Sequence, residues 1–227
     1  DAPIAIIRSD STKMSEQYSM MKPVETILSG PASSVTGGIN CTKETDCLIV
    51  DMGGTTTDIS IVKNGVPLNA DSGVRIGSWK TFVHGVFIDT FGLGGDSGIR
   101  VEHGRPVLLS QRRIPFCVAS KKWPCIKEQL NELIDNGRYH SHPLYEFLVL
   151  QKDIKNTLIY SDDEIELCNI LKKEPILIEK AALAVGRDVY TINTKRLETE
   201  GIIIRIGLTP TDIMHLKGDF TQFDTTA

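Results

Sequence analysis

The sequence has no long run of apolar residues, which excludes a transmembrane helix because such a helix needs about 20 of them. Its first residues also lack the basic and apolar segments of a secretory signal peptide. Positive charge is not in excess, since 25 Lys and Arg stand against 29 Asp and Glu. The formal charge of -4 gives no general attraction for nucleic acid or an anionic membrane. We expect a cytoplasmic globular chain with no membrane partner and no nucleic-acid partner.

Cysteine pairs with metal-site spacing are also missing. The chain has 5 cysteines, an odd number, and none form a C-x-x-C pair. A disulfide framework or a structural zinc site is therefore not expected, and reduced thiols are. His140 and His142 have no evident third ligand, so we expect a surface loop there, and His84, His103 and His215 are expected to be structural.

Two common nucleotide signatures are absent or broken. No Gly-x-x-x-x-Gly-Lys-Ser/Thr segment occurs, which excludes the P-loop class. Residues 92–97, GLGGDS, approach the dinucleotide pattern G-x-G-x-x-G, but Ser97 stands in place of the last glycine. Residues 95–98 match a serine-protease nucleophile motif, but no histidine context supports that reading.

The chain also lacks an initiator methionine and begins with a strand-like run at residues 4–8. We expect it to be cut from a longer protein or processed. Its 227 residues suffice for one large domain or two small ones. Pro31 suits the first turn of a helix that follows Ser29 and Gly30.

Residues 46–120 have mainly strand character. The apolar run CLIV, residues 47–50, predicts a strand buried on both faces. The next segment alternates and ends in Asn64-Gly65, a strong hairpin signal.

Residues 124–220 read as helical. Ile126, Leu130, Leu133 and Ile134 are predicted to share one helix face, with Gly137 as the stop. Further signals are a capping box from Ser161 to Glu164, a strand in IIIRIG (residues 202–207), and a short helix capped by Thr209 or Thr211.

Residues 161–206 leave a second interpretation open. Three helices followed by a strand resemble a winged-helix order, with Arg187, Lys195 and Arg196 on or near the third helix, as in a DNA-binding regulator. The neighbouring residues 162–166 are acidic, which favours a plain helical subdomain.

The most informative stretch is LIVDMGGTTTDISIVKNG, residues 48–65, where an apolar run ends in Asp51, two glycines and three threonines. Backbone N–H groups in a tight turn can cradle a phosphate, and glycine permits close approach and unusual torsions. Threonine hydroxyls add donors, and an aspartate at a strand end can hold magnesium through water. A polar hairpin turn is the plainer interpretation, but it does not require this combination of residues.

This stretch resembles the phosphate motif of the actin-like ATPase superfamily. Together with ETILSGPASSVTGG, DTFGLGGDSGIRVEHGRP and GLTPTDIMHLKGDF, it resembles the A-type subunit of the hydantoinase/oxoprolinase family. The resemblance implies an α/β fold of the actin-like ATPase (ribonuclease H-like) type, a mixed sheet with a helical subdomain. Residues 1–120 would form the ATPase half and residues 121–227 a mainly helical subdomain returning to the core.

The resemblance also implies an ATP-dependent hydrolase that opens a cyclic amide by phosphoryl activation of its carbonyl, with ATP and Mg²⁺ as cofactors. Asp51 and Asp96 would be the catalytic and metal-binding residues. The nucleotide-binding residues would be Gly53, Gly54, Thr55, Thr56, Thr57, Asp58, Gly94, Gly95 and Ser97. The turn at residues 51–58 would line one side of the nucleotide cleft, and the glycine-rich residues 94–96 would line its far side.

One departure from the superfamily pattern stands out. Two phosphate loops, one from each half, normally clamp the nucleotide, and only one is found in this sequence. We therefore expect the chain to be inactive alone and to need the N-terminal half of the same enzyme. A B-type hydantoinase subunit and a small cyclic amide are further expected partners. A regulatory or scaffold protein on the same fold is the alternative.

Overall fold

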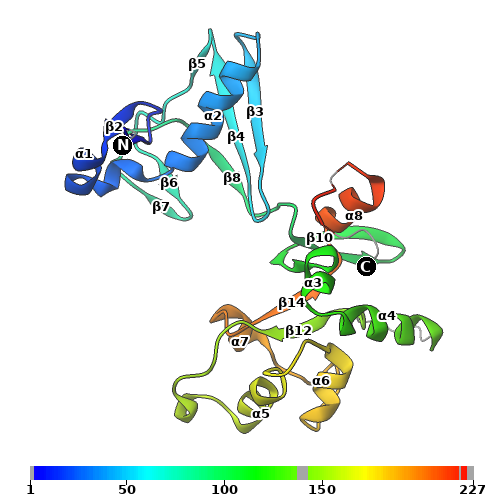
Figure 1. Ribbon diagram of the computed structural model, residues 1–227. Coiled ribbons are helices and arrows are strands. Elements are labelled where there is room, and N and C mark those ends of the chain that lie inside the picture. Colours follow the sequence, from blue (N-terminus) through cyan, green and yellow to red (C-terminus); the bar gives the residue numbers. More distant parts are fainter. Residues whose placement is uncertain (1–2, 137–142, 220, 224–227) are drawn as a thin grey trace. The chain divides into compact units, whose positions relative to one another are not determined.

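The computed structural model describes residues 3–136, 143–219 and 221–223 (Figure 1). The chain divides into two compact units, Asp1–Gly92 and Leu93–Ala227. Both units contain helices and strands, so the predicted mixed α/β class is confirmed. The boundary expected near residue 120 stays a prediction. Within the described ranges, no helix has both the length and the apolar character of a membrane span.

The first unit contains small antiparallel sheets, and a helix covers one face of the largest. Its elements are β1 (Ala5–Ile7), β2 (Lys13–Ser15), α1 (Glu16–Met21), η1 (Pro23–Thr26), α2 (Ser29–Cys41), β3 (Cys47–Met52), β4 (Thr57–Lys63), β5 (Val66–Pro67), β6 (Arg75–Ile76), β7 (Trp79–Lys80) and β8 (Asp89–Phe91). The main sheet has the order β3-β4-β5, and β8 also pairs with β4. Helix α2 lies along β3 and β4 in Figure 1.

Local sequence signals explain these elements. Asn64 and Gly65 both have positive φ, 53° and 73°, as a two-residue hairpin turn between β4 and β5 requires. Pro31 lies in the first turn of α2, where its missing N–H costs no hydrogen bond. The predicted hairpin and helix start are therefore confirmed.

The prediction that strand β3 is buried on both faces is wrong for this structure. Cys47 and Ile49 face α2 and join the core of Ala32, Val35, Val62 and Val86. The other face is bare, with Leu48 63%, Val50 57% and Met52 63% exposed. The reason is that β3 and β4 form an antiparallel pair with a single covering helix, whereas a continuous apolar run is typical of a strand covered on both faces.

The second unit contains the remaining elements. They are β9 (Ser97–Glu102), β10 (Arg105–Arg112), β11 (Ile114–Pro115), α3 (Phe116–Lys122), α4 (Cys125–Asp135), β12 (Phe147–Leu150), η2 (Thr157–Ile159), α5 (Asp162–Ile170), β13 (Ile176–Leu177), α6 (Ile178–Ala184), α7 (Lys195–Thr199), β14 (Ile203–Gly207) and α8 (Pro210–Lys217). A mixed sheet has the order β11-β14-β12-β13, and β9 pairs with β10 as a separate ribbon.

This sheet corrects the helical reading of residues 124–220. Strand β12 is a central strand with Phe147 and Leu148 fully buried, and its apolar run is too short to distinguish from a helix segment by pattern alone. Ile126 is buried on α4, but Ile134 is 74% exposed, so the predicted apolar face is shorter than expected. The expected stop at Gly137 lies outside the described residues.

The helix caps of the second unit are confirmed. Ser161 and Glu164 form a capping box at α5. Thr209, rather than Thr211, caps α8 and forms a second capping box with Asp212. Ser and Thr are favoured as N-cap residues because their hydroxyl oxygens accept hydrogen bonds from the first N–H groups of a helix. Those N–H groups have no acceptor within the helix.

The winged-helix order expected for residues 161–206 is not completed by a hairpin. Strand β14 pairs in parallel with β11 and antiparallel with β12, and the chain then enters α8. Arg187 is paired with Asp163 at 2.7 Å, and Arg196 with Glu200 at 3.0 Å. These guanidinium groups therefore lie in local ion pairs, which favours the plain helical reading.

Candidate phosphate-binding site

The first candidate loop is the turn between β3 and β4. The strands stay in register as far as Met52 opposite Thr57, so the loop consists of residues 53–56. One internal hydrogen bond closes it, from the Gly53 N–H to the Thr56 carbonyl at 2.9 Å. Figure 1 shows this turn at the end of a long two-stranded hairpin. The predicted strand, turn and strand context is confirmed.

The turn presents donors to solvent. Gly54 and Thr55 are exposed and Thr56 is half-buried. Within the described part of the chain, the N–H groups of these three residues have no hydrogen-bond acceptor, and neither do the Thr55 and Thr56 hydroxyls. Consecutive free N–H groups form the kind of concavity that binds anions. This arrangement is suited to phosphate oxygens.

The role of the two glycines is narrower than the sequence suggested. Neither Gly53 nor Gly54 has a positive φ, so the turn does not require their special torsions. An added Cβ at Gly53 would lie 3.5 Å from the Thr56 carbonyl oxygen, which is ordinary contact. Their absence of side chains leaves the backbone open to close approach, and this is the property a phosphate would use.

Two carboxylates lie at the base of the turn. Asp51 and Asp58 are direct cross-strand partners, a placement that disfavours two negative charges unless a cation or a donor compensates. Asp58 Oδ1 accepts a hydrogen bond at 2.6 Å from the hydroxyl of Thr90 on β8, so one oxygen of this carboxylate already has a partner. Asp51 is exposed. Thr57 is buried within β4, between Met52 and Phe91 on the flanking strands.

The carboxylates near the turn could hold magnesium only as a single ligand beside water and phosphate, not as a metal site built from protein side chains alone. No group of three or more His, Cys, Asp or Glu side chains among the described residues could hold a metal ion. Mg²⁺ is commonly held by one or two carboxylates, several waters and phosphate oxygens. Asp51 fits that role as a single carboxylate ligand, direct or through water, beside a bound phosphate.

The second candidate loop, residues 94–97, belongs to the second unit. Gly94 and Ser97 are buried and bond to each other, with the Gly94 N–H donating to Ser97 Oγ at 2.9 Å and the Ser97 N–H donating to the Gly94 carbonyl at 3.0 Å. Their polar groups therefore close the turn and are not directed at a ligand. Gly95 and Asp96 are half-buried. The prediction that both loops line one cleft stays a prediction.

The carboxylate of Asp96 is already neutralised. Arg112 Nε and an Arg112 terminal nitrogen both lie 3.1 Å from Asp96 Oδ2. The Asp96 side chain is 16% exposed and that of Arg112 is 56% exposed. As a metal ligand, Asp96 would need Oδ1 or release from Arg112, so the expected metal-binding role is weaker here than at Asp51.

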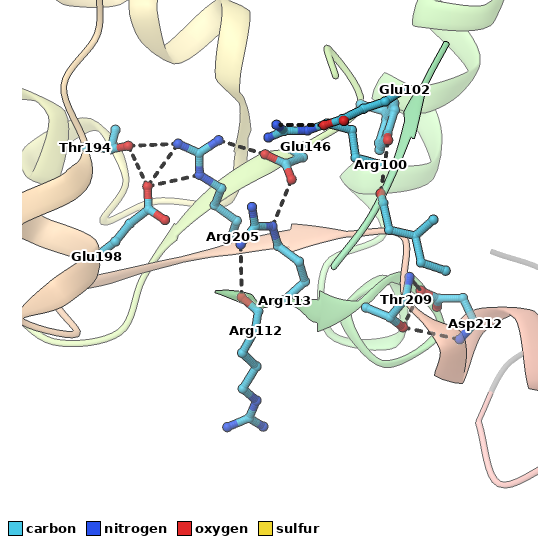
Figure 2. Close-up of polar contacts among 12 residues, drawn as sticks. Arg100, Glu102, Arg112, Arg113, Glu146, Thr194, Glu198, Arg205, Thr209 and Asp212 are labelled. Atoms are coloured by element: carbon cyan, nitrogen blue, oxygen red, sulfur yellow. Dashed lines mark hydrogen bonds and ion pairs between the residues drawn. The ribbon is translucent and has the colours of Figure 1, made fainter. Parts of the chain in front are cut away.

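An ion network in the second unit includes Arg113, whose backbone N–H bonds the second loop (Figure 2). Glu146 accepts from Arg113 Nε at 2.8 Å and from Arg205 at 2.7 Å, and Arg205 also bonds Glu198. Burial alone would raise the pKa of Glu146, but the two guanidinium groups outweigh it and lower that pKa. Arg113 passes so near Gly98 that an added Cβ would lie 3.1 Å from its Cγ.

The sequence did not identify the residues that hold the second loop. The Arg113 N–H donates to the Asp96 carbonyl at 2.8 Å, and Thr211 at the start of α8 bonds the Gly95 carbonyl. The sequence placed a helix cap at Thr209 or Thr211, but a contact across more than a hundred residues leaves no local pattern. The one signal in the sequence was that GLGGDS (residues 92–97) and GLTPTD (residues 207–212) occur in the same chain, because the two segments contact each other.

Comparisons with known proteins give one family match and one similar solved structure. Residues 1–113 match the family model described as hydantoinase/oxoprolinase. Among solved structures, a nucleotide-free acetone carboxylase, described for the mechanism of ATP-dependent acetone carboxylation, is similar, with 19% identity and a TM-score of 0.41. That similarity covers 48% of this chain and 16% of the solved chain. No curated protein matches the sequence. The part of the chain that matches the hydantoinase/oxoprolinase family, residues 1–113, therefore carries both candidate loops.

Proposed function

We propose that this chain is part of an ATP-dependent hydantoinase/oxoprolinase-type enzyme of actin-like architecture that opens a small cyclic amide. The observation that carries the proposal is the β3–β4 turn, where residues 54–56 present free N–H groups and two hydroxyls directly beyond Asp51. A plain hairpin turn needs none of these features, whereas a nucleotide phosphate uses all of them.

The reaction proposed is phosphoryl transfer followed by hydrolysis. The amide carbonyl oxygen takes the γ-phosphoryl group of ATP and ADP leaves. Water then adds to the activated carbon, and the ring C–N bond breaks as nitrogen takes a proton, which leaves an acyl phosphate. A second water hydrolyses the acyl phosphate to the carboxylate and inorganic phosphate. The turn would position and neutralise the phosphates, which is the main contribution of a protein to phosphoryl transfer.

Magnesium would supply charge neutralisation of the phosphate oxygens when bound. Asp51 would hold it or its water, and the Gly54, Thr55 and Thr56 N–H groups would bind the phosphate. In the second unit, Gly95 and Asp96 would supply donors from residues 94–97. We propose that the N-terminal half of the enzyme supplies one more phosphate loop, in addition to the two candidate loops of this chain. A B-type subunit is a further proposed partner.

The test is amide-dependent ATP hydrolysis by the assembled enzyme. We expect an Asp51→Asn chain to lose activity by about a hundredfold or more, because removal of one preorganised electrostatic contact costs that much in other enzymes. Asp71→Asn, an exposed change on the 68–73 loop, is the matched control. Full activity of the Asp51 variant would contradict the proposal.

The isolated chain should bind a non-hydrolysable ATP analogue with magnesium only at millimolar concentration and should open no ring. Vigorous ring opening by the purified chain would contradict the incompleteness proposed here. A scaffold protein would instead give an assembled enzyme whose ATP hydrolysis does not respond to Asp51 at all.

A further inference from the structure

We propose that Thr211 is a positioning residue that aims the Asp96 N–H at a phosphate oxygen. The inference deepens the function proposed above and rests on it, since it names the donor in the second loop and the residue that orients it. Thr211 touches no phosphate itself and acts through one peptide group.

The contact is double and spans the unit. Both the N–H and the hydroxyl of Thr211 donate to the Gly95 carbonyl oxygen, at 2.9 Å and 2.8 Å. A trans peptide is planar, so its C=O and N–H point in opposite directions. Because Thr211 fixes the Gly95 carbonyl towards α8, the Asp96 N–H of the same peptide is directed away from α8.

The neighbouring peptides are fixed in the same way. The Gly94 carbonyl accepts from the Ser97 N–H, which directs the Gly95 N–H outward. The Asp96 carbonyl accepts from the Arg113 N–H. Over the ranges that the structure covers, only the N–H groups of Gly95 and Asp96 in this turn lack an acceptor. They are adjacent, as an anion-binding turn requires.

Thr211 is itself held firmly, so it can impose this orientation before any ligand binds. The capping box of Thr209 and Asp212 fixes the first turn of α8, and Asp212 also accepts the Cys117 N–H at 2.9 Å. His215 Nδ1 lies 2.8 Å from the Thr211 carbonyl. His215 lies on α8 itself and Cys117 on α3, so these contacts come from α8 and from one further element.

The charge of the turn is also compatible with a phosphate. An unpaired Asp96 carboxylate beside these N–H groups would repel an anion. The exposed Arg112 side chain pairs with Asp96 Oδ2 and compensates this charge.

The experiment follows backbone amide signals of the ¹⁵N-labelled whole chain while a magnesium-bound non-hydrolysable ATP analogue is added to millimolar concentration. We expect the amides of Gly95 and Asp96 to shift along with those of residues 54–56. Thr211→Ser should behave like the original chain, because it keeps the hydroxyl. Thr211→Val should weaken the Asp96 response by about tenfold in affinity, the factor a hydrogen bond of this kind supports.

Thr199→Val is the matched control, since it removes a hydroxyl that bonds a backbone carbonyl within α7, far along the chain from the turn. Shifts at residues 54–56 without shifts at Gly95 and Asp96 would overturn the inference and leave the proposed function standing. An unchanged response in Thr211→Val would also overturn it. Absence of shifts at both loops would overturn both proposals. Amide spectra of each variant without ligand verify folding.

Discussion

Glu146 is central to the ion network of the second unit, because its one carboxylate pairs with the buried Arg113 and the half-buried Arg205. Glu146→Gln preserves the shape and removes the charge. We expect it to lower the free energy of unfolding by about 3 kcal/mol, since a broken buried ion pair leaves uncompensated charge. Urea unfolding measures the loss, and the exposed Glu166→Gln should change stability by less than about 0.5 kcal/mol.

The same carboxylate gives stability a definite pH dependence. The folded-state pKa of Glu146 is lowered, so its contribution is fully present above the unfolded-state pKa and is lost as pH falls through the folded-state pKa. We expect the unfolding midpoint of the original chain to fall on acidification more steeply than that of Glu146→Gln. Parallel pH profiles for the two proteins would contradict this assignment.

The cysteine thiols should differ in their reactivity towards alkylating reagents. Burial raises the pKa of Cys117 to about 12, aided by Asp212, and that of Cys168 to about 11. Their thiols stay protonated at neutral pH and are inaccessible, while Cys41 is exposed. Alkylation followed by peptide mass spectrometry should modify Cys41 first and reach the buried pair only in denaturant. Early labelling of Cys117 would show that α3 opens in the native state.

Single residues were predictable where the chemistry is local. Asp51, Gly54 and Thr55 are close in the sequence, so the pattern alone placed them in one turn and at its base, while their role in binding stays a prediction. Arg113 and Glu146 were not predictable, because neither has a partner nearby in the sequence and a lone charge reads as a solvated surface residue.

At the scale of elements, glycine conformation separates two substitutions of the same type. Gly65 has a φ of 73° in the β4–β5 turn, so Gly65→Ala should cost about 1 kcal/mol. Gly37 lies in α2 with open space around its position, so Gly37→Ala should stabilise by about 0.5–1 kcal/mol. Thermal unfolding monitored by circular dichroism checks both. Equal effects would mean that backbone conformation does not control stability here.

Helices and strands were predictable where turn or cap residues mark their ends. The β4–β5 hairpin, the capping box at Ser161 and the cap at Thr209 carry residues whose local chemistry fixes the turn or the cap. Strand β12 carries none, and its four residues take strand form only through pairing with β13 and β14. The bare face of β3 could not be foreseen, because a pattern reports apolarity but not how many layers cover it.

At the scale of the molecule, the two units should fold independently. One apolar core lies wholly within the first unit and two others lie within the second. We expect residues 93–227 expressed alone to unfold cooperatively in urea and to keep dispersed amide signals. A broad, non-cooperative transition would show that the second unit needs the first.

The bare face of β3 has a practical consequence for handling the protein. Leu48, Val50 and Met52 form a contiguous apolar strip on a strand whose outer edge is unpaired within the described residues. Sulfate strengthens association of such surfaces. In a digest that separates the two units, ammonium sulfate should therefore precipitate the first unit ahead of the second, so fractional salting-out offers a means of purifying them apart.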